Sequence, residues 1–196
     1  MNQKSQTPST FILLSDQHET LASAVLVEQH RQHKVLRLTS PPRGDLFHHP
    51  YINVLSHGTE PSLSWRGEVT QVRGDLLYFE ATEKADPQLR RLFRIPLVFH
   101  SYITPLSPPG ARLPISSKDI SCGGIALYAS APLQKGDVYE IIIPFTEPPL
   151  LLVMQVLRPI SEPQHLYACE FVDLLPQEEA LLQEKIFDFS LQRSHH

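Results

Sequence analysis

The sequence predicts a mainly β protein made of two small antiparallel β-barrels, the second closed by a C-terminal helix. The 18 prolines are spread along the 196 residues and interrupt helices, so the apolar segments between them are short. Turn residues separate these segments at fairly regular intervals, which is typical of antiparallel barrels. Hydrophobic residues make up 41% and charged residues 19% of the chain, enough to bury an ordinary core.

The N-terminal half contains four segments with the composition of strands, at residues 35–38, 52–55, 63–72 and 76–79. A tight turn at residues 73–75 predicts a hairpin between the last two. Ahead of them we expect a helix from Asp16 to about Gln29, because Asp16 and Glu19 have capping-box spacing and apolar residues follow. This half is therefore predicted to be a small barrel or sandwich with one helix.

A polar stretch at residues 82–88, which contains Pro87, marks the predicted domain boundary. The domains are accordingly predicted to span residues 1–86 and 87–196. Expected strands of the second half lie at residues 95–102, 124–128, 138–145, 150–157 and 166–172. A closing helix is predicted from Pro176, with Leu182, Ile186 and Phe189 along one face.

The overall charge disfavours a nucleic-acid-binding protein. The net charge is −4 and no stretch is dense in lysine and arginine, so we expect no partner among DNA or RNA. The N-terminal residues are polar and no apolar run approaches the ~20 residues of a membrane helix, so a cytoplasmic protein without membrane insertion is predicted. Cys122 and Cys169 form neither a disulfide framework nor a C-x-x-C site.

Metal sites and catalytic motifs are not predicted. His48, His49 and His57 lie near one another in the sequence, and His30 and His33 have helical spacing, but no carboxylate or cysteine completes a ligand pattern. The chain contains no G-x-S-x-G, H-E-x-x-H or Walker motif. We therefore expect a protein that is not an enzyme and uses no metal or other cofactor.

Two short segments carry residues suited to a guanine nucleotide. In the first, Arg90, Arg91 and Arg94 follow the polar linker. Arginine presents a planar fork of donors that pairs with a phosphate or with the O6 and N7 edge of guanine. Taken alone, these arginines would be better explained as a solvated basic edge that pairs with Glu83 or Asp86.

The second segment runs from Asp119 to Gly124. Asp119 can accept hydrogen bonds from the N1 and N2 edge of guanine, and Ser121 adds a small donor and acceptor. Gly123 and Gly124 permit positive φ or close approach of the backbone to a ligand. Alone, this segment could be a simple turn before a strand.

In this order, R-x-x-x-R followed by D-x-S-x-x-G resembles the paired signature of PilZ domains, the cyclic di-GMP receptors of bacteria. The matching residues are Arg90 and Arg94 in the first motif, and Asp119, Ser121 and Gly124 in the second. The resemblance covers about residues 88–193. It includes a late segment, residues 168–171, that is similar to the family's G-x-x-F but carries Ala168 where glycine is usual.

More weakly, residues 11–86 resemble the N-terminal barrel of flagellar-brake (YcgR-type) proteins. The resemblance implies a receptor whose nucleotide binding at the linker and PilZ barrel changes the domain arrangement and the binding of a protein partner. It implies a role in flagellar motility or biofilm control, with a partner in the flagellar motor or another output system. Arg91, Gly123 and Leu89 are further candidates for ligand contact, and leucine at 89, where some relatives carry an extra arginine, favours one ligand per chain.

Two alternatives remain open at this point. The chain could be a PilZ interaction or adaptor protein that binds no nucleotide, although such members usually lose the motif arginines or the aspartate. It could also be an oligonucleotide-binding barrel, which should bind single strands with steep salt dependence.

Overall fold

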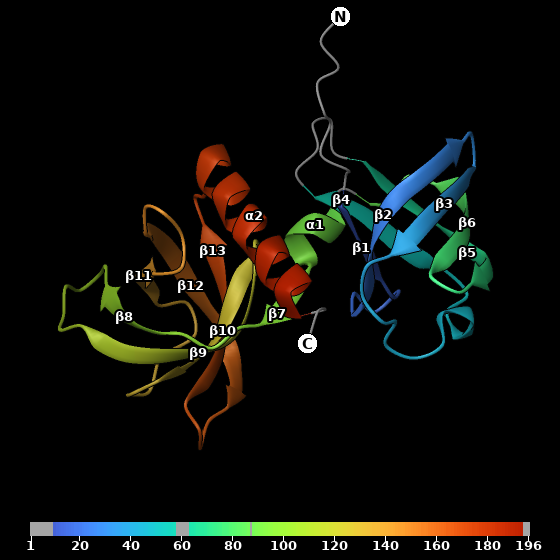
Figure 1. Cartoon of the computed structure of the whole chain (residues 1–196). Coiled ribbons are helices and arrows are strands. Elements are labelled where there is room, and N and C mark those ends of the chain that lie inside the picture. The colour runs from blue at the N-terminus through green and yellow to red at the C-terminus, as the bar shows by residue number, and fades with distance from the viewer. Residues whose placement is uncertain (1–9, 58–62, 87, 194–196) are drawn as a thin grey trace, which may run out of the picture. The chain divides into compact units, whose positions relative to one another are not determined.

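The structure, a computed structural model, describes residues 10–57, 63–86 and 88–193. The chain forms two compact units, one of residues 1–90 together with 187–196, the other of residues 91–186 (Figure 1). The predicted architecture of two antiparallel barrels followed by a C-terminal helix is confirmed. Pro87, in the predicted boundary, lies outside the described residues.

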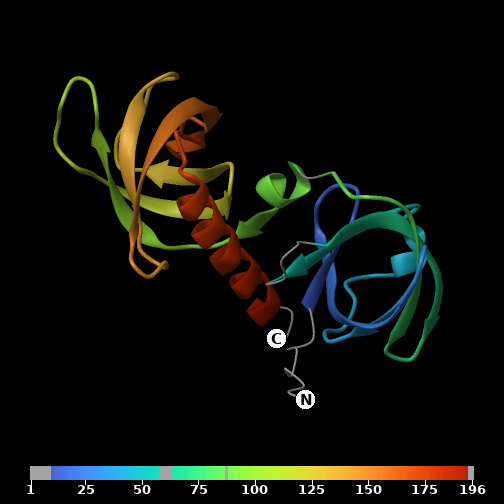
Figure 2. The ribbon, with the colours of Figure 1, turned by 90° about the horizontal axis from the view of Figure 1, so that it is seen from above.

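The first barrel closes in the order β1-β2-β3-β6-β5-β4, and every neighbouring pair is antiparallel. Its strands are β1 (Thr10–Leu14), β2 (Thr20–His30), β3 (His33–Leu38), β4 (Ile52–His57), β5 (Ser64–Arg73) and β6 (Leu76–Glu83). A short 3-10 helix, η1 (Leu46–His48), precedes β4. Figure 2 shows these strands, blue to green, curving around a common centre.

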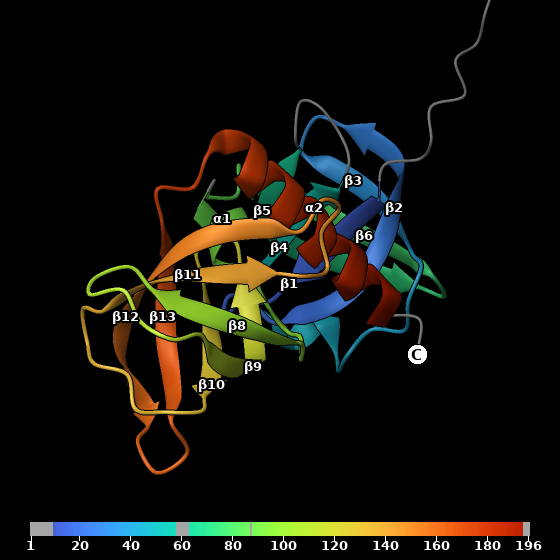
Figure 3. The ribbon, with the colours of Figure 1, turned by 90° about the vertical axis from the view of Figure 1, so that its left-hand side faces the viewer.

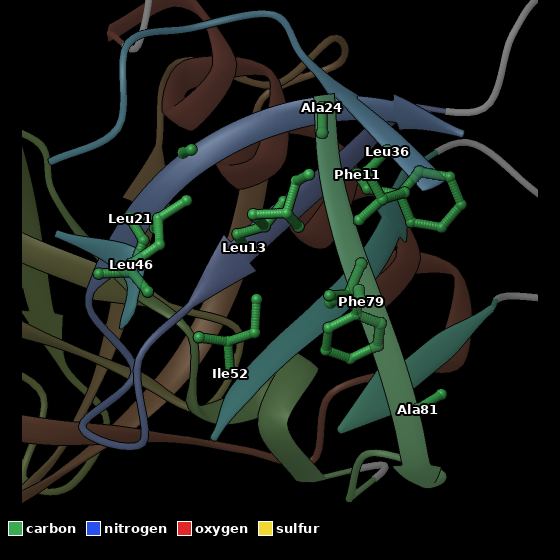
Figure 4. Packing of buried hydrophobic residues seen from close by; sticks show 12 residues of the cluster. Phe11, Leu13, Leu21, Ala24, Leu36, Leu46, Ile52, Phe79 and Ala81 are labelled. Atoms are coloured by element: carbon green, nitrogen blue, oxygen red, sulfur yellow. The ribbon is translucent and has the colours of Figure 1, made fainter. Parts of the chain in front are cut away.

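The interior of the first barrel is filled by alternate residues of its strands. Phe11 and Leu13 of β1 point inward and pack with Leu36 and Phe79, all of them almost completely buried (Figure 4). The Phe11 ring stacks on Trp65 at 5.3 Å between centroids. This two-residue periodicity of inward side chains is what a strand with one face on a core requires.

The predicted helix at residues 16–29 is wrong, because this segment forms a turn and then strand β2. The Ser15 hydroxyl accepts hydrogen bonds from the backbone N–H groups of Gln17 and Glu19, so the polar residues build a turn instead of a helix cap. Residues 21–24 are buried on both sides of the strand, and β2 is paired with both β1 and β3. Pairing with two neighbours satisfies the backbone and outweighs the local helical pattern.

The second barrel closes in the order β10-β13-β12-β11-β8-β9, with β9 and β10 paired and β7 added beside β9 (Figure 3). Its strands are β7 (Arg94–Pro96), β8 (His100–Pro105), β9 (Leu113–Ser121), β10 (Gly124–Ala129), β11 (Val138–Ile143), β12 (Leu150–Ser161) and β13 (Leu166–Val172). The segment predicted as one strand at residues 95–102 is divided between β7 and β8, and β9 was not predicted as a strand.

The predicted C-terminal helix is present as α2 (Pro176–Arg193). Leu182 and Ile186 are buried as expected, and Phe187 is buried whereas Phe189 is only partly so. Glu178 accepts a hydrogen bond from the Leu175 N–H at 3.0 Å, which caps the first turn. None of the helices in the described part of the chain is long and apolar enough to span a membrane.

Candidate functional site

The arginine segment forms a short helix, α1 (Gln88–Leu92), and then enters β7. The Asp86 carboxylate accepts a hydrogen bond from the Gln88 N–H at 2.8 Å and so starts the helix. Leu89 and Phe93 are buried, at 7% and 0% exposure, and anchor the segment at both ends. The Arg90 side chain lies outside the described part of the structure.

The two motifs meet where β7 pairs with β9. Arg94 lies opposite Ser121 and Pro96 opposite Asp119 in this antiparallel pair. The Arg94 Nη1 donates a hydrogen bond to Asp119 Oδ1 at 2.5 Å, which makes a charged contact between the R-x-x-x-R and D-x-S-x-x-G segments. The side chains are 43% and 22% exposed, so a ligand from solvent can reach both groups.

The other two motif residues support the strand junction. The Ser121 hydroxyl, buried at 2% exposure, donates to the Gly124 carbonyl at 3.3 Å. A Cβ at Gly124 would lie 2.2 Å from the Cys169 carbonyl oxygen and 2.9 Å from the Glu170 Cα. Only glycine therefore allows β10 to approach β13 this closely, which gives Gly124 a structural reason for its place in the motif.

Strand register places the motif residues on the outside of the second barrel. Two rows of paired residues cross its strands, the first made of Arg94, Ser121, Gly124, Glu170 and Gln155, the second of Pro96, Asp119, Ala126, Ala168 and Arg158. The row between them is buried in the barrel and consists of Ile95, Ile120, Ile125, Cys169 and Val156. Because successive strand residues point to opposite faces, the two rows form one outer surface, here called the motif face.

Arg91 lies beside the motif face and is held by α2. Its backbone carbonyl accepts a hydrogen bond from the Gly123 N–H at 3.1 Å, and its Nε lies 3.9 Å from Glu179 Oε1. A Cβ added to Gly123 would lie 3.5 Å from the Arg91 carbonyl oxygen, an ordinary contact, so Gly123 is not required for packing. Burial raises the pKa of the adjacent Cys122 thiol to about 12, with the Glu179 charge adding to the effect and Arg91 opposing it.

Sequence reasoning missed Glu170, Gln155 and Arg158 on the motif face. Alternation along β12 would place Leu157 on the same side as Gln155, but a β-bulge between Val156 and Arg158 shifts the register. Arg158, not Leu157, therefore pairs with Ala168. The bulge is set by strand pairing, and simple alternation along β12 does not predict it.

The histidines do not form a metal site in the described residues, where no group of three or more His, Cys, Asp or Glu side chains could hold a metal ion. His48 Nδ1 lies 3.2 Å from an Asp45 carboxylate oxygen, and His57 Nε2 lies 3.1 Å from Asp188 Oδ1. Each of these two histidines thus has a carboxylate partner.

The arrangement of both motifs on one barrel face agrees with a family comparison, in which the PilZ domain model matches residues 88–188. The chain belongs to the PilZ domain family. As the sequence resemblance implied, this is a family of receptors and not of enzymes, and its ligand is a nucleotide rather than a resident cofactor.

Solved structures similar to this PilZ protein include the Bacillus subtilis inhibitor of motility MotI/DgrA, with 14% identity, 95% of this chain and 97% of that chain covered and a TM-score of 0.45. Escherichia coli YcgR in complex with c-di-GMP has 13% identity and a TM-score of 0.40, and the match covers 95% of this chain and 85% of that chain. Borreliella burgdorferi PlzA in complex with c-di-GMP has 12% identity, coverage of 89% and 86%, and a TM-score of 0.36. Among curated proteins, none matches this chain. The family assignment rests on the domain match and not on these distant similarities.

Proposed function

We propose that this PilZ protein is a cytoplasmic receptor for cyclic di-GMP that binds the nucleotide on the motif face. The observation that carries the proposal is the contact between Arg94 and Asp119, which joins the two signature motifs through two side chains that are both partly exposed. A fork of donors and a carboxylate acceptor side by side supply both kinds of partner that a guanine and its phosphate need.

The Arg94–Asp119 pair also suggests how the ligand enters. Exposed ion pairs contribute only about 0–1 kcal/mol to stability, so separating this one costs little. In the complex, Asp119 would accept from the guanine N1 and N2 edge, and Arg94 would turn to the O6 and N7 edge or to a phosphate. Both groups thereby exchange a weak mutual contact for stronger partners on the ligand.

The same site gives the ligand a means of acting on the rest of the protein. Arg90 lies four residues before Arg94, at the end of the polar linker. A ligand held by both arginines would therefore fix the geometry of the linker. We propose that binding changes the arrangement of the two units and thereby the binding of a protein partner in motility or biofilm control. Leu89 is buried and has no donor, which supports one ligand per chain.

Calorimetric titration of the full chain with cyclic di-GMP tests the proposal, with GTP and cyclic di-AMP as controls. Saturable binding of cyclic di-GMP near one per chain, and much weaker binding of both controls, is the expected result. Absence of binding by a folded sample would contradict the receptor function and favour an interaction protein without a nucleotide. Scattering profiles with and without ligand test the change in domain arrangement separately.

A further inference from the structure

Arg158 lies at the far side of the motif face from the two signature motifs. It is exposed on β12, pairs with Ala168, and belongs to the same row as Asp119. Its guanidinium has no ion-pair partner among the described residues. An arginine that is exposed and unpaired beside a candidate ligand site can contribute its full fork of donors to a ligand.

The residues between Asp119 and Arg158 along the row have small side chains, of which Ala126 is buried and Ala168 half-buried. Ala126 and Ala168 are the two residues that separate them along the row. Neighbouring strands lie ~4.8 Å apart, so Asp119 and Arg158, three strand spacings apart, are separated by ~14 Å measured along the curved sheet. Neither alanine carries a side chain long enough to separate the two ends, so a ligand that follows the curved wall of the barrel would meet an acceptor at one end and a donor fork at the other.

The β-bulge of β12 places Arg158 in this row. Val156 pairs with Cys169, and both residues are buried. The register then shifts by one residue, so that Leu157 has no pairing partner on β13 and Arg158 pairs with Ala168. Without the bulge, Leu157 would occupy the end of the row and would offer no hydrogen bond. Bulges re-aim side chains in this way next to functional sites.

We infer that Arg158 is a specificity-determining residue that binds the second half of the cyclic dinucleotide, through the O6 and N7 edge of its guanine. This inference rests on the proposed function. A guanine at Asp119 and Arg94 would leave the second base of a cyclic dinucleotide to extend along the row toward Arg158. Glu170 lies in the adjacent row, two residues from Ala168 along β13, and its negative charge disfavours a phosphate there more than the neutral edge of a base.

The inference is tested by titrating cyclic di-GMP into the wild type and into Arg158→Ala, Arg158→Lys and Arg112→Ala. Arg112 is the matched control, because it is also an exposed arginine of the unit formed by residues 91–186 but lies outside the motif face. Arg158→Ala should raise the Kd about tenfold, as expected for loss of one bidentate contact to a base. Arg158→Lys should recover only part of the affinity because lysine lacks the planar fork, and Arg112→Ala should bind like the wild type.

Equal affinities of Arg158→Ala and Arg112→Ala, with the wild type still binding, would overturn this inference and leave the proposed function intact. Full recovery in Arg158→Lys would overturn the bidentate contact, since charge alone would then account for the effect. Absence of cyclic di-GMP binding by the wild type would overturn both the proposed function and this inference. Circular dichroism of each variant ensures that a weaker affinity reflects the site and not the fold.

Discussion

Arg94 and Asp119 lie 25 residues apart in the sequence, yet the Arg94 guanidinium donates to the Asp119 carboxylate at 2.5 Å. The pairing of β7 with β9 joins them, because it places Pro96 opposite Asp119. Arg94 lies two residues before Pro96 on the same strand, and its side chain is on the same face of the sheet. Each group is thus held by a hydrogen-bonded strand, while its charge is balanced by a partner that a nucleotide can replace.

Removing the charged partners should abolish tight binding without unfolding the protein. Arg90→Ala, Arg94→Ala and Asp119→Ala should each weaken cyclic di-GMP binding by about 2–3 kcal/mol, since a desolvated ligand group would lose a charged partner. Asp119→Asn should be intermediate because the amide keeps one acceptor oxygen. Calorimetry measures the affinities, and unchanged affinity in both arginine variants would contradict the site.

Gly124→Ala should destabilise the second barrel. Its Cβ would lie 2.2 Å from the Cys169 carbonyl oxygen, a backbone atom of the neighbouring strand, so β10 and β13 would have to move apart. We expect a loss of about 3 kcal/mol in the free energy of unfolding, as for severe overpacking. Gly123→Ala is the matched control, because its Cβ would meet nothing closer than 3.5 Å. Urea denaturation of the two variants should separate them, and equal stabilities would contradict the close approach.

Glu179→Gln should release Arg91 from α2. The carboxylate oxygen lies 3.9 Å from Arg91 Nε, and both side chains are partly exposed, so the contact is weak. If Arg91 also contacts the ligand, removing its competitor should tighten cyclic di-GMP binding by about two- to fivefold, the range of a contact worth a few tenths to 1 kcal/mol. Glu184→Gln, an exposed position on the same helix, serves as the control. A gain in Glu179→Gln that persists when Arg91 is replaced by alanine would show that Arg91 is not its cause.

The two cysteines should be unreactive in the folded protein and should make its stability fall at high pH. Burial is the main reason that the pKa of Cys122 and of Cys169 is raised from 9.0 to about 12. Between these values the unfolded chain loses its thiol protons and the folded chain keeps them, so the free energy of unfolding should decrease as the pH rises above 9. Replacing both cysteines with alanine should flatten this dependence in urea denaturation. Rapid labelling of the wild-type thiols at pH 8 without denaturant would contradict their burial.

Local patterns in the sequence were sufficient for the main architectural predictions. Short apolar segments separated by turns predicted two barrels, and the spacing of Leu182 and Ile186 predicted the final helix. The motif residues were also identifiable, because R-x-x-x-R and D-x-S-x-x-G are each encoded within a few residues. The capping-box pattern at Asp16 led to the wrong prediction of a helix. The Ser15 hydroxyl accepts hydrogen bonds from the nearby N–H groups and forms a turn, and the segment that follows pairs as a strand with β1 and β3.

The tertiary structure decided what depends on register between distant strands. The motifs identify Arg94 and Asp119 in the sequence, but the pairing of β7 with β9 is what makes the two residues partners. Likewise, the close approach of β10 to β13 is what requires glycine at position 124. The bulge that places Arg158 opposite Ala168 is also a feature that only the pairing of strands determines. One residue of register shift moves a side chain to the other face of a sheet, and long-range hydrogen bonding sets that register, which no local pattern can specify.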